Sequence, residues 1–448
     1  MKSENIVAIS TALGASGVAV IRISGDSPLD VAEKMFFPLE KISVREFEPN
    51  KMYVGEIKTD KFSDFGMCVY FKAPKSFTGE DTIELHSHGG VAITKGILEK
   101  ALSSGARLAN NGEFTKRAFI NGKLSLSSAE GLIDMINAES VSGVKAGYSL
   151  YREKLTKKIT CLQDKITEVL SSIDVDIDYP EENLDKVSKQ TLIENISFVI
   201  AEIDKLLSSF KTGQTLKNGV NVALVGKPNT GKSSLLNALL NYDKAIVSDI
   251  AGTTRDIVEG SIDILDVRFN FFDTAGIRES GDRIESLGVD LSKKILNQAD
   301  LIVFLLDLAD FDKEDQTILE LVKDKNTLIV ANKIDKGQAK KDIELTPHIK
   351  ISALTGENVE KLKSAIYDKT VGEGIDYNGD YLVEQRHFEA LKNAREKLAF
   401  ALSMVELAPL DIVAIDIKDG WDYLGEISGK TATEEIINDI FSRFCVGK

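Results

Sequence analysis

The sequence predicts a multidomain protein that combines an α+β domain, an all-helical domain and an inserted α/β domain with a mostly parallel sheet. At 448 residues the chain is too long for one ordinary core. Its residue pattern changes near residues 119 and 213, and the helical pattern that stops near residue 212 returns after residue 371. The simplest topology therefore inserts the α/β domain between two halves of one helical domain. The predicted boundaries are 1–118, 119–212, 213–371 and 372–448.

The composition is that of a soluble globular protein, with 43% hydrophobic and 28% charged residues. There is no apolar run long enough to span a bilayer, and the segment MKSENIVAIS lacks the features of a signal peptide. We therefore expect a cytoplasmic protein with no membrane partner. The net charge of −15 would repel a polyanion, so any RNA contact should be local or shared with another protein.

Three cysteines, an odd number spaced far apart, argue against a disulfide framework or a thiolate metal site. Cys68 and Cys161 are expected to be small core residues.

The amino-terminal segment alternates short β-branched runs with turn residues, as in an α+β domain. The predicted strands lie in Ile6–Ser10, Gly17–Ser24, Met67–Ala73 and Asp81–Ser87, and an amphipathic helix is predicted over Val91–Ser103. His86 and His88 lie two apart on one strand and so share a face. With no further ligand nearby in sequence, we interpret them as hydrogen-bonded structural residues rather than metal ligands.

Apolar residues three and four apart predict helices on both sides of the inserted domain. The break at Asp178, Tyr179 and Pro180 should separate two of them, because proline ends or bends a helix. Within the inserted domain, near-continuous apolar strands alternate with helices, as in a parallel sheet covered on both faces. These strands are Asn221–Gly226, Phe269–Gly276, Leu301–Asp307, Thr327–Lys333 and His348–Ala353.

The segment GKPNTGKS, Gly226 to Ser233, fits the phosphate-loop pattern and lies between a predicted strand and a predicted helix, as that motif requires. Gly226 and Gly231 allow the backbone N–H groups to wrap a phosphate. Lys232 should neutralise the outer phosphates, and Ser233 should ligate magnesium. A chance glycine-rich turn would not have all of these features in register.

Three further motifs predict guanine selection and metal placement. Asp273, in DTAG, should hold magnesium through water, and Gly276 should meet the γ-phosphate. In NKID, the carboxylate of Asp335 can accept two hydrogen bonds from guanine that adenine cannot offer. Ser352 and Ala353 should support the base.

Ile277 follows DTAG, where many regulatory GTPases carry a glutamine that orients the attacking water. An aliphatic side chain cannot do this, so another group must position water and offset developing charge. The segment between Ser248 and Glu285 is the place to look for it.

The chain resembles the MnmE (TrmE) family of tRNA uridine-modification GTPases. The resemblance runs through RISG at Arg22, SFTGEDTIELHSHGG, GEFTKRAFINGKLSLSSAE, the phosphate loop, DIAGTTRD at Asp249–Asp256 and the terminal CVGK. It implies a homodimer in which two GTPase domains meet during hydrolysis with potassium between them. The implied potassium ligands are Asn229, Ser248, Ile250 and Thr253.

The resemblance also implies the roles of other residues. Thr254 would close on magnesium, and Glu285 would position water through a second, bridging water; from the residues alone, Glu285 would be a solvated helix residue. Arg255 and Asp256 would stabilise the dimer. The implied catalytic set is Glu285, Asn229, Lys232 and Arg255. The full GTP-binding set is Asn229, Thr230, Gly231, Lys232, Ser233, Ser234, Ser248, Thr253, Thr254, Asp273, Gly276, Asn332, Lys333, Asp335, Ser352 and Ala353.

The family's amino-terminal domain binds 5-formyl- or methylene-tetrahydrofolate and dimerises, and its binding positions match Arg22, Glu84, Lys123 and Lys448. A carboxylate such as Glu84 can accept two hydrogen bonds from a pterin, whereas Arg22 and Lys123 can meet folate carboxylates or carbonyls. Each could equally be an ordinary surface ion-pair residue. Cys445 could act as a nucleophile or only contact the ligand.

The resemblance further implies a flavoprotein partner, MnmG, in a heterotetramer or larger complex. Together they would convert carbon five of the wobble uridine in certain tRNAs to its carboxymethylaminomethyl form, using the folate one-carbon unit. Two alternatives stay open. A ribosome-assembly GTPase should carry an appended RNA-binding module. In a folate-responsive regulatory switch, GTP turnover would only time partner association.

Overall fold

The computed structural model describes residues 3–178, 189–242, 260–273, 297–307, 309–336, 349–372, 379 and 381–448. The chain forms two compact units, each built from separate stretches of sequence. The first comprises Met1–Ile133, Leu150–Ile200 and Ala390–Lys448. The second comprises Asp134–Ser149 and Ala201–Glu389. Among the described helices, none combines the length and apolarity needed to cross a membrane.

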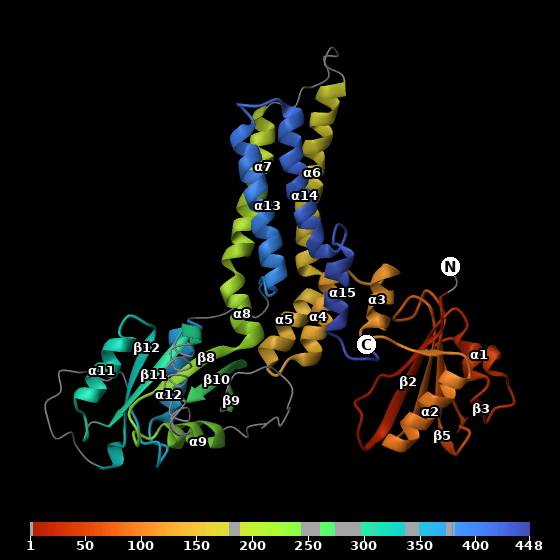
Figure 1. Ribbon diagram of the computed structural model, residues 1–448, viewed down its shortest axis with the longest axis horizontal. Helices are drawn as coiled ribbons and strands as arrows, with labels where there is room; N and C mark the ends of the chain where they lie inside the picture. The colour runs from red at the N-terminus through yellow and green to blue at the C-terminus, as the bar shows by residue number, and fades with distance from the viewer. Residues whose placement is uncertain are drawn as a thin grey trace, which may run out of the picture. The chain divides into compact units, whose positions relative to one another are not determined.

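The first unit contains a seven-stranded sheet of order β3-β4-β5-β6-β2-β1-β7 (Figure 1). Neighbouring strands are antiparallel except β1 and β7, which are parallel. The strands are β1 (Ile6–Ile9), β2 (Ser16–Gly25), β3 (Phe36–Pro38), β4 (Met52–Lys58), β5 (Ser63–Phe71), β6 (Asp81–Gly89) and β7 (Arg107–Leu108).

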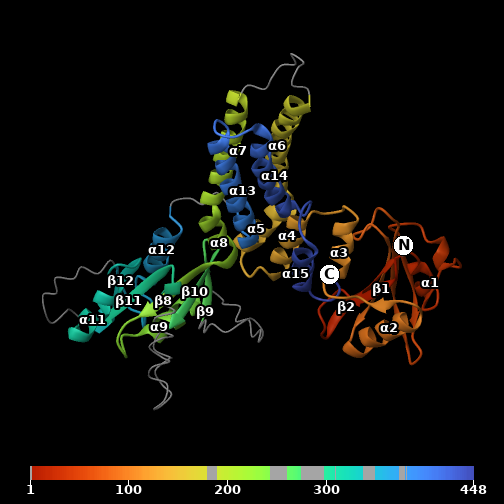
Figure 2. The same ribbon diagram turned by 45° about the horizontal axis from the view of Figure 1, so that its top comes forward.

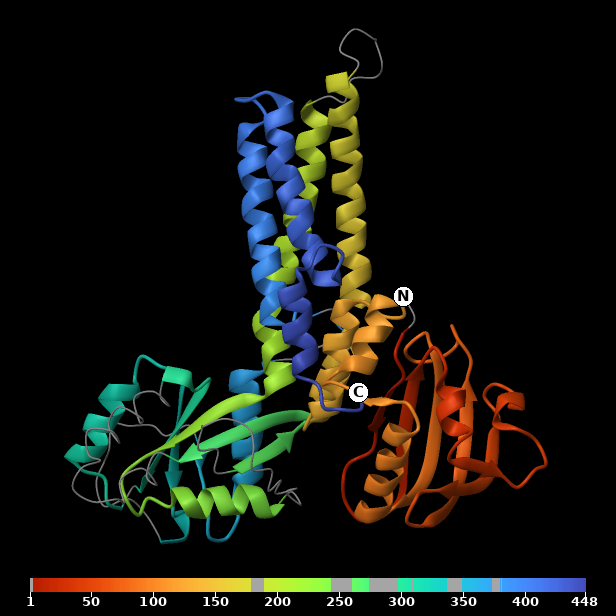
Figure 3. The same ribbon diagram turned by 45° about the vertical axis from the view of Figure 1, so that its right-hand side comes forward.

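One face of this sheet packs against α2 (Val91–Ser103) and α1 (Pro28–Ala32). The helix α2 lies along one face of the sheet (Figure 3). Ile97 and Ala101 of α2 are fully buried and pack in one cluster with Ile21 and Leu85. The four predicted strands and the predicted helix are therefore confirmed. The sequence analysis missed β3, β4 and β7.

The remaining helices of this unit include α3 (Glu113–Ile120), α6 (Lys154–Asp178), α14 (Leu410–Ser428) and α15 (Glu434–Ser442). The helix α4 (Leu126–Asn137) extends into the second unit, as do α7 (Lys189–Ser208) and α13 (Gln385–Met404). The last residue of α6 is Asp178, where the sequence predicted a break.

Helices from the two sides of the inserted segment pack on each other, since α6 and α14 lie side by side (Figures 1 and 2). The amide of Gln163 donates to the backbone oxygen of Trp421 at 3.1 Å, and the indole N–H of Trp421 donates to Thr167 at 3.1 Å. Cys68 is buried as expected, but Cys161 is exposed. The prediction for Cys161 was wrong because the neighbouring Ile159 and Leu162 form the buried stripe of α6.

The second unit contains a six-stranded sheet of order β13-β12-β11-β8-β10-β9, in which only the β9–β10 pair is antiparallel. Its strands are β8 (Val220–Val225), β9 (Gly260–Ile264), β10 (Val267–Asp273), β11 (Leu301–Asp307), β12 (Thr327–Asn332) and β13 (Ile349–Lys350). Each strand expected here is present, so the mostly parallel sheet is confirmed. The edge strand β9 was not predicted.

Helices cover both faces of this sheet, as the apolar strands required. The helices α9 (Lys232–Tyr242) and α12 (Val359–Thr370) pack on one face, and α11 (Lys313–Val322) packs on the other. The unit also contains α5 (Val141–Tyr151, whose last two residues belong to the first unit) and α8 (Phe210–Asn218). The phosphate-loop segment follows β8 directly, at the carboxyl ends of the parallel strands, where such folds bind ligands.

Candidate nucleotide site and amino-terminal polar site

The phosphate loop joins β8 to α9 in a conformation that depends on its residue types. Gly231 has a φ of +95°, and a Cβ atom there would lie 2.4 Å from the amide nitrogen of Asn332. Asn229 has a φ of +62°, a left-handed conformation that asparagine adopts more readily than most residues. The backbone of the phosphate loop therefore requires glycine at position 231 and favours asparagine at position 229.

Lys232 is buried within this loop. Its ammonium donates to the backbone oxygens of Gly226 and Lys227, each at 2.9 Å. Thr230 Oγ1 also donates to the oxygen of Lys227 at 2.9 Å. Ser233 and Ser234 follow in the first turn of α9, and the N-terminus of a helix favours anions. The loop thus gathers a cation, hydroxyls and a helix N-terminus around one position.

The segment NKID, predicted to recognise guanine, is hydrogen-bonded to the phosphate loop. The amide of Asn332 donates to the oxygen of Thr230 at 2.8 Å, and its own oxygen accepts from the N–H of Ala353 at 2.9 Å. Ser352 Oγ donates to Asp335 at 2.6 Å, which orients the carboxylate expected to read the base. Residues more than a hundred positions apart in sequence are thereby assembled into one site.

Several predicted residues lie outside the described part of the chain: Ser248, Ile250, Thr253, Thr254, Arg255, Asp256, Gly276, Ile277 and Glu285. Asp273 ends β10 as expected. For magnesium, the chemistry of the donors fits, because Ser233 supplies a hard oxygen at the start of α9 and phosphate oxygens would supply others. In the described ranges, no group of three or more His, Cys, Asp or Glu could hold a metal ion by itself.

In the first unit, Arg22 and Glu84 face each other across β2 and β6. Arg22 Nε lies 2.7 Å from Glu84 Oε1, and both side chains are less than one-fifth exposed. The guanidinium also stacks over the rings of Phe77 and Phe114, at 5.4 and 5.7 Å from their centroids. Burial raises the pKa of Glu84, but the neighbouring His86 and Arg22 outweigh it and lower the pKa overall. Glu84 is therefore ionised at neutral pH.

Lys123 and the carboxy-terminal tail contact other segments of the first unit. Lys123 Nζ donates to the oxygen of Pro74 at 2.9 Å, in the loop that carries Phe77. Lys448 follows Gly447, which packs so closely on β1 that an added Cβ would lie 2.3 Å from the oxygen of Ile9. The thiol of Cys445 belongs to an exposed residue of this docked tail.

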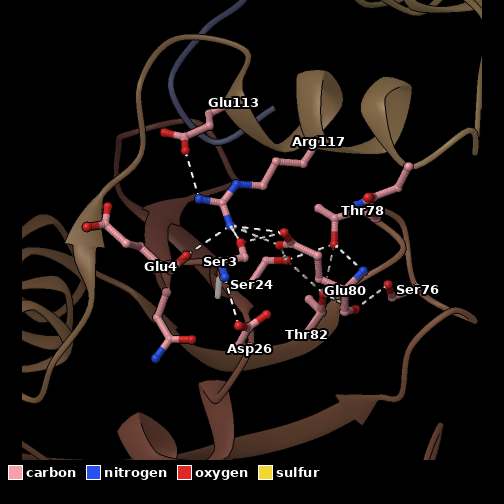
Figure 4. Close-up of polar contacts among 12 residues, drawn as sticks. Ser3, Glu4, Ser24, Asp26, Ser76, Thr78, Glu80, Thr82, Glu113 and Arg117 are labelled. Atoms are coloured by element: carbon pink, nitrogen blue, oxygen red, sulfur yellow. Dashed lines mark hydrogen bonds and ion pairs between the residues drawn. The ribbon is translucent and has the colours of Figure 1, made fainter. Parts of the chain in front are cut away.

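A buried polar network that the sequence analysis missed joins α3 to the same loop (Figure 4). Arg117 donates to Glu80 at 2.9 Å, to Ser3 at 2.6 Å and to Glu113 at 2.9 Å. Glu80 in turn accepts from Ser24 on β2 at 2.9 Å. The arginine in EFTKRAF and the glutamate in FTGED carried no separate signal, because only the fold places them together.

The two histidines behave differently. His88 Nδ1 lies 2.7 Å from Asp64 Oδ1, so the expectation that His88 is hydrogen-bonded is confirmed. His86 Nε2 is buried 3.6 Å from Glu84 Oε2 and has no hydrogen-bond partner among the described residues. The expectation that His86 is hydrogen-bonded is therefore wrong for this nitrogen.

Comparison with known proteins finds matches along nearly the whole chain. Residues 126–445 match the model of the MnmE helical domain, and residues 5–123 match that of the GTP-binding protein TrmE N-terminus. The tRNA modification GTPase MnmE of Clostridioides difficile (strain 630) is 41% identical over 455 residues, covering 99% of both chains. The chain belongs to the MnmE family of tRNA modification GTPases. It is therefore a GTP hydrolase.

A second relative supports the same assignment. MnmE of Aquifex aeolicus (strain VF5) is 40% identical over 454 residues, covering 99% of this chain and 100% of the relative. The match to the TrmE N-terminus model favours the MnmE family over the alternative of a ribosome-assembly GTPase.

Proposed function

We propose that the chain hydrolyses GTP in the cytoplasm to drive modification of carbon five of the wobble uridine in tRNA. The observation that supports nucleotide binding is the hydrogen bonding of Asn332 and Lys333 to the phosphate loop. Asp335 accepts a hydrogen bond from Ser352 beside them. This assembly supports a site in which base recognition and phosphate binding lie side by side. The relatives' printed name, tRNA modification GTPase, supports the tRNA substrate.

We further propose that hydrolysis depends on potassium and on pairing of two GTPase domains. Ile277 cannot orient water, and Asn229 lies in the phosphate loop with a left-handed backbone. Asn229, Ser248, Ile250 and Thr253 would supply oxygen atoms to the ion, and Thr254 would join Ser233 on magnesium. Glu285 would position water, while Arg255 would stabilise the pair. The inserted GTPase domain would span 213–371, between helical halves at 119–212 and 372–448.

The test is the GTPase rate of the full chain against alkali cation at several protein concentrations. We expect turnover to fall sharply when sodium replaces potassium, when the protein is diluted, and in Asn229→Ala. Equal rates in both ions at all concentrations would reject the potassium-dependent mechanism while leaving GTP hydrolysis intact.

We propose that domain 1–118 mediates dimerisation and binds a tetrahydrofolate at Arg22, Glu84, Lys123 and Lys448, with Cys445 nearby. The ionised Glu84 offers oxygen acceptors, and Arg22 is held between two aromatic rings. Arg22→Ala should weaken binding of 5-formyltetrahydrofolate and leave GTP affinity unchanged. Loss of both affinities together would indicate a folding defect.

The folate would supply the one-carbon unit, and a flavoprotein of the MnmG type would be the partner. Reconstitution tests this proposal. Modified tRNA should form only when the chain, the flavoprotein, GTP and the folate are all present. Modification without folate would contradict the one-carbon role. Modification without this chain would support the alternative that it is only a regulatory switch.

A further inference from the structure

Lys227, the second residue of the phosphate loop, has its ammonium buried against the start of α11. Its Nζ donates to the backbone oxygen of Asp310 at 2.6 Å. It also lies 2.8 Å from Asp315 Oδ2 and 3.0 Å from Asp312 Oδ2. The side chain of Lys227 is only 7% exposed. A lysine in this motif position therefore reaches a different element instead of solvent.

The two carboxylates belong to the N-terminal cap of α11. Asp312 Oδ1 accepts from the N–H of Glu314 at 2.8 Å and from that of Asp315 at 3.4 Å. Asp315 Oδ2 accepts from the N–H of Asp312 at 3.0 Å, completing a reciprocal capping box. Asp315 is fully buried, and the ammonium of Lys227 lies beside its carboxylate. A buried carboxylate without a cation is strongly destabilising, so this contact holds both elements in place.

Burial lowers the pKa of Lys227, but the side-chain hydrogen bonds to Asp315 and Asp312 outweigh it and raise the pKa overall. The ammonium therefore stays charged through the neutral range, and the contact remains an ion pair.

The backbone of the same residue organises the loop. The oxygen of Lys227 accepts from Lys232 Nζ and from Thr230 Oγ1, both at 2.9 Å. Lys232 is the residue expected to meet the outer phosphates. The position of residue 227 thus determines where two nucleotide-facing groups are held, while its side chain is fixed to α11.

We propose that Lys227 is a positioning residue for guanine nucleotides, which fixes the phosphate loop to the capped N-terminus of α11. A loop held in its binding conformation loses less entropy when the nucleotide binds. Linkage then requires the reverse effect: a bound nucleotide must stabilise the α11 cap by the same factor. The proposal concerns nucleotide binding, and it holds whether or not potassium and folate act as proposed above.

The test is the release rate of a fluorescent GDP analogue from the full chain. Lys227→Met should release GDP about tenfold faster or more, within the usual range of coupling between sites. Lys227→Arg, which keeps a cation, should restore release to within about threefold of the original rate. Lys313→Met is the matched control, because Lys313 is an exposed lysine in the first turn of α11. It should leave release unchanged.

Hydrogen exchange supplies a readout that a purely structural role would not change. In the original protein, GDP should slow exchange of the capping amides of Glu314 and Asp315, and Lys227→Met should abolish this protection. Should Lys227→Met fail to fold, Asp315→Asn serves instead, since it keeps a cap acceptor and removes the charge. Release of GDP at the original rate by a folded Lys227→Met or Asp315→Asn variant would overturn the proposal.

Discussion

The ammonium of Lys333 lies 2.5 Å from the backbone oxygen of Asn229. The same ammonium pairs with Asp307 at the end of β11, at 3.1 Å. One lysine of the guanine motif thereby connects a strand end to the phosphate loop. The proposed base site and the proposed phosphate site are consequently joined by hydrogen bonds and an ion pair, so a substitution in one should alter binding at the other.

Removing this ammonium should weaken binding of the whole nucleotide. We expect Lys333→Met to lower GTP affinity by roughly tenfold to a hundredfold, the equivalent of one charge-assisted hydrogen bond of about 1.5–3 kcal/mol. Fluorescence titration measures the effect. Lys336→Met, an exposed lysine three residues further on, is the control and should leave affinity unchanged. Equal affinities for the two variants would contradict the role given to Lys333.

Base selection should follow the carboxylate of Asp335. Asp335→Asn replaces an acceptor with an amide that also donates, so it no longer matches the two N–H donors of guanine. We expect affinity to shift from GTP toward xanthosine triphosphate, whose base presents a carbonyl at that position. Competition between the two nucleotides measures the shift. An unchanged preference for GTP would show that another group reads the base.

The buried pair of Arg117 and Glu80 should stabilise the first unit strongly. Their side chains are 12% and 14% exposed, and removing one partner leaves a buried charge unpaired. Arg117→Leu should cost about 3–5 kcal/mol of unfolding free energy, seen as a lower Tm. The control is Lys61→Met, which removes the exposed Lys61–Glu99 pair and should cost less than about 1 kcal/mol. Similar losses in both variants would contradict the buried role.

The carboxy-terminal tail should depend on the absence of a side chain at Gly447. This residue has a φ of +103°, and a Cβ would collide with the oxygen of Ile9. We expect Gly447→Ala to release the tail and speed carboxypeptidase digestion. Gly105→Ala is the control, because Gly105 has a φ of +116° but open space around its Cβ position. Digestion at the original rate would show that docking does not need this close contact.

A buried cluster in the second unit should make stability depend on pH. Asp134 lies 2.8 Å from Lys217, which also contacts Glu384. Burial, followed by the charge of Glu384, raises the pKa of Asp134 to about 8. The folded state then holds a proton that the unfolded state releases near the ordinary value of 3.8, so this stabilisation is present at low pH and is lost as pH rises toward 8.

We therefore expect Tm to fall more steeply between about pH 4 and about pH 8 in the original protein than in Asp134→Asn, because only in this range does the folded state hold a proton on Asp134 that the unfolded state has lost. Thermal unfolding across this range is the measurement, and parallel Tm profiles would contradict it. Burial lowers the pKa of Lys217, but the charges of Glu384 and Asp134 outweigh it and raise the pKa above its ordinary value of 10.5. The stabilisation that Lys217 contributes is therefore lost only above pH 10.5.

Local patterns in the sequence were sufficient to predict much of the fold and the nucleotide motifs. The phosphate loop could be located because its glycines, lysine and serine are adjacent in sequence and lie between a strand and a helix. The helix Val91–Ser103 was predicted to the residue, since its apolar spacing is uninterrupted. The strands β3, β7 and β9 were missed because all three lie at sheet edges, and β3 and β7 are only three and two residues long.

What the sequence by itself determined was the set of local motifs, because each consists of neighbouring residues whose spacing carries the signal. The tertiary structure decided which distant groups meet: Lys333 with Asn229, Lys227 with Asp315, and Arg117 with Glu80. These contacts join residues tens to about a hundred positions apart. Residues of these kinds are common along the chain, and their spacing does not say which of them will meet, because the fold brings the partners together.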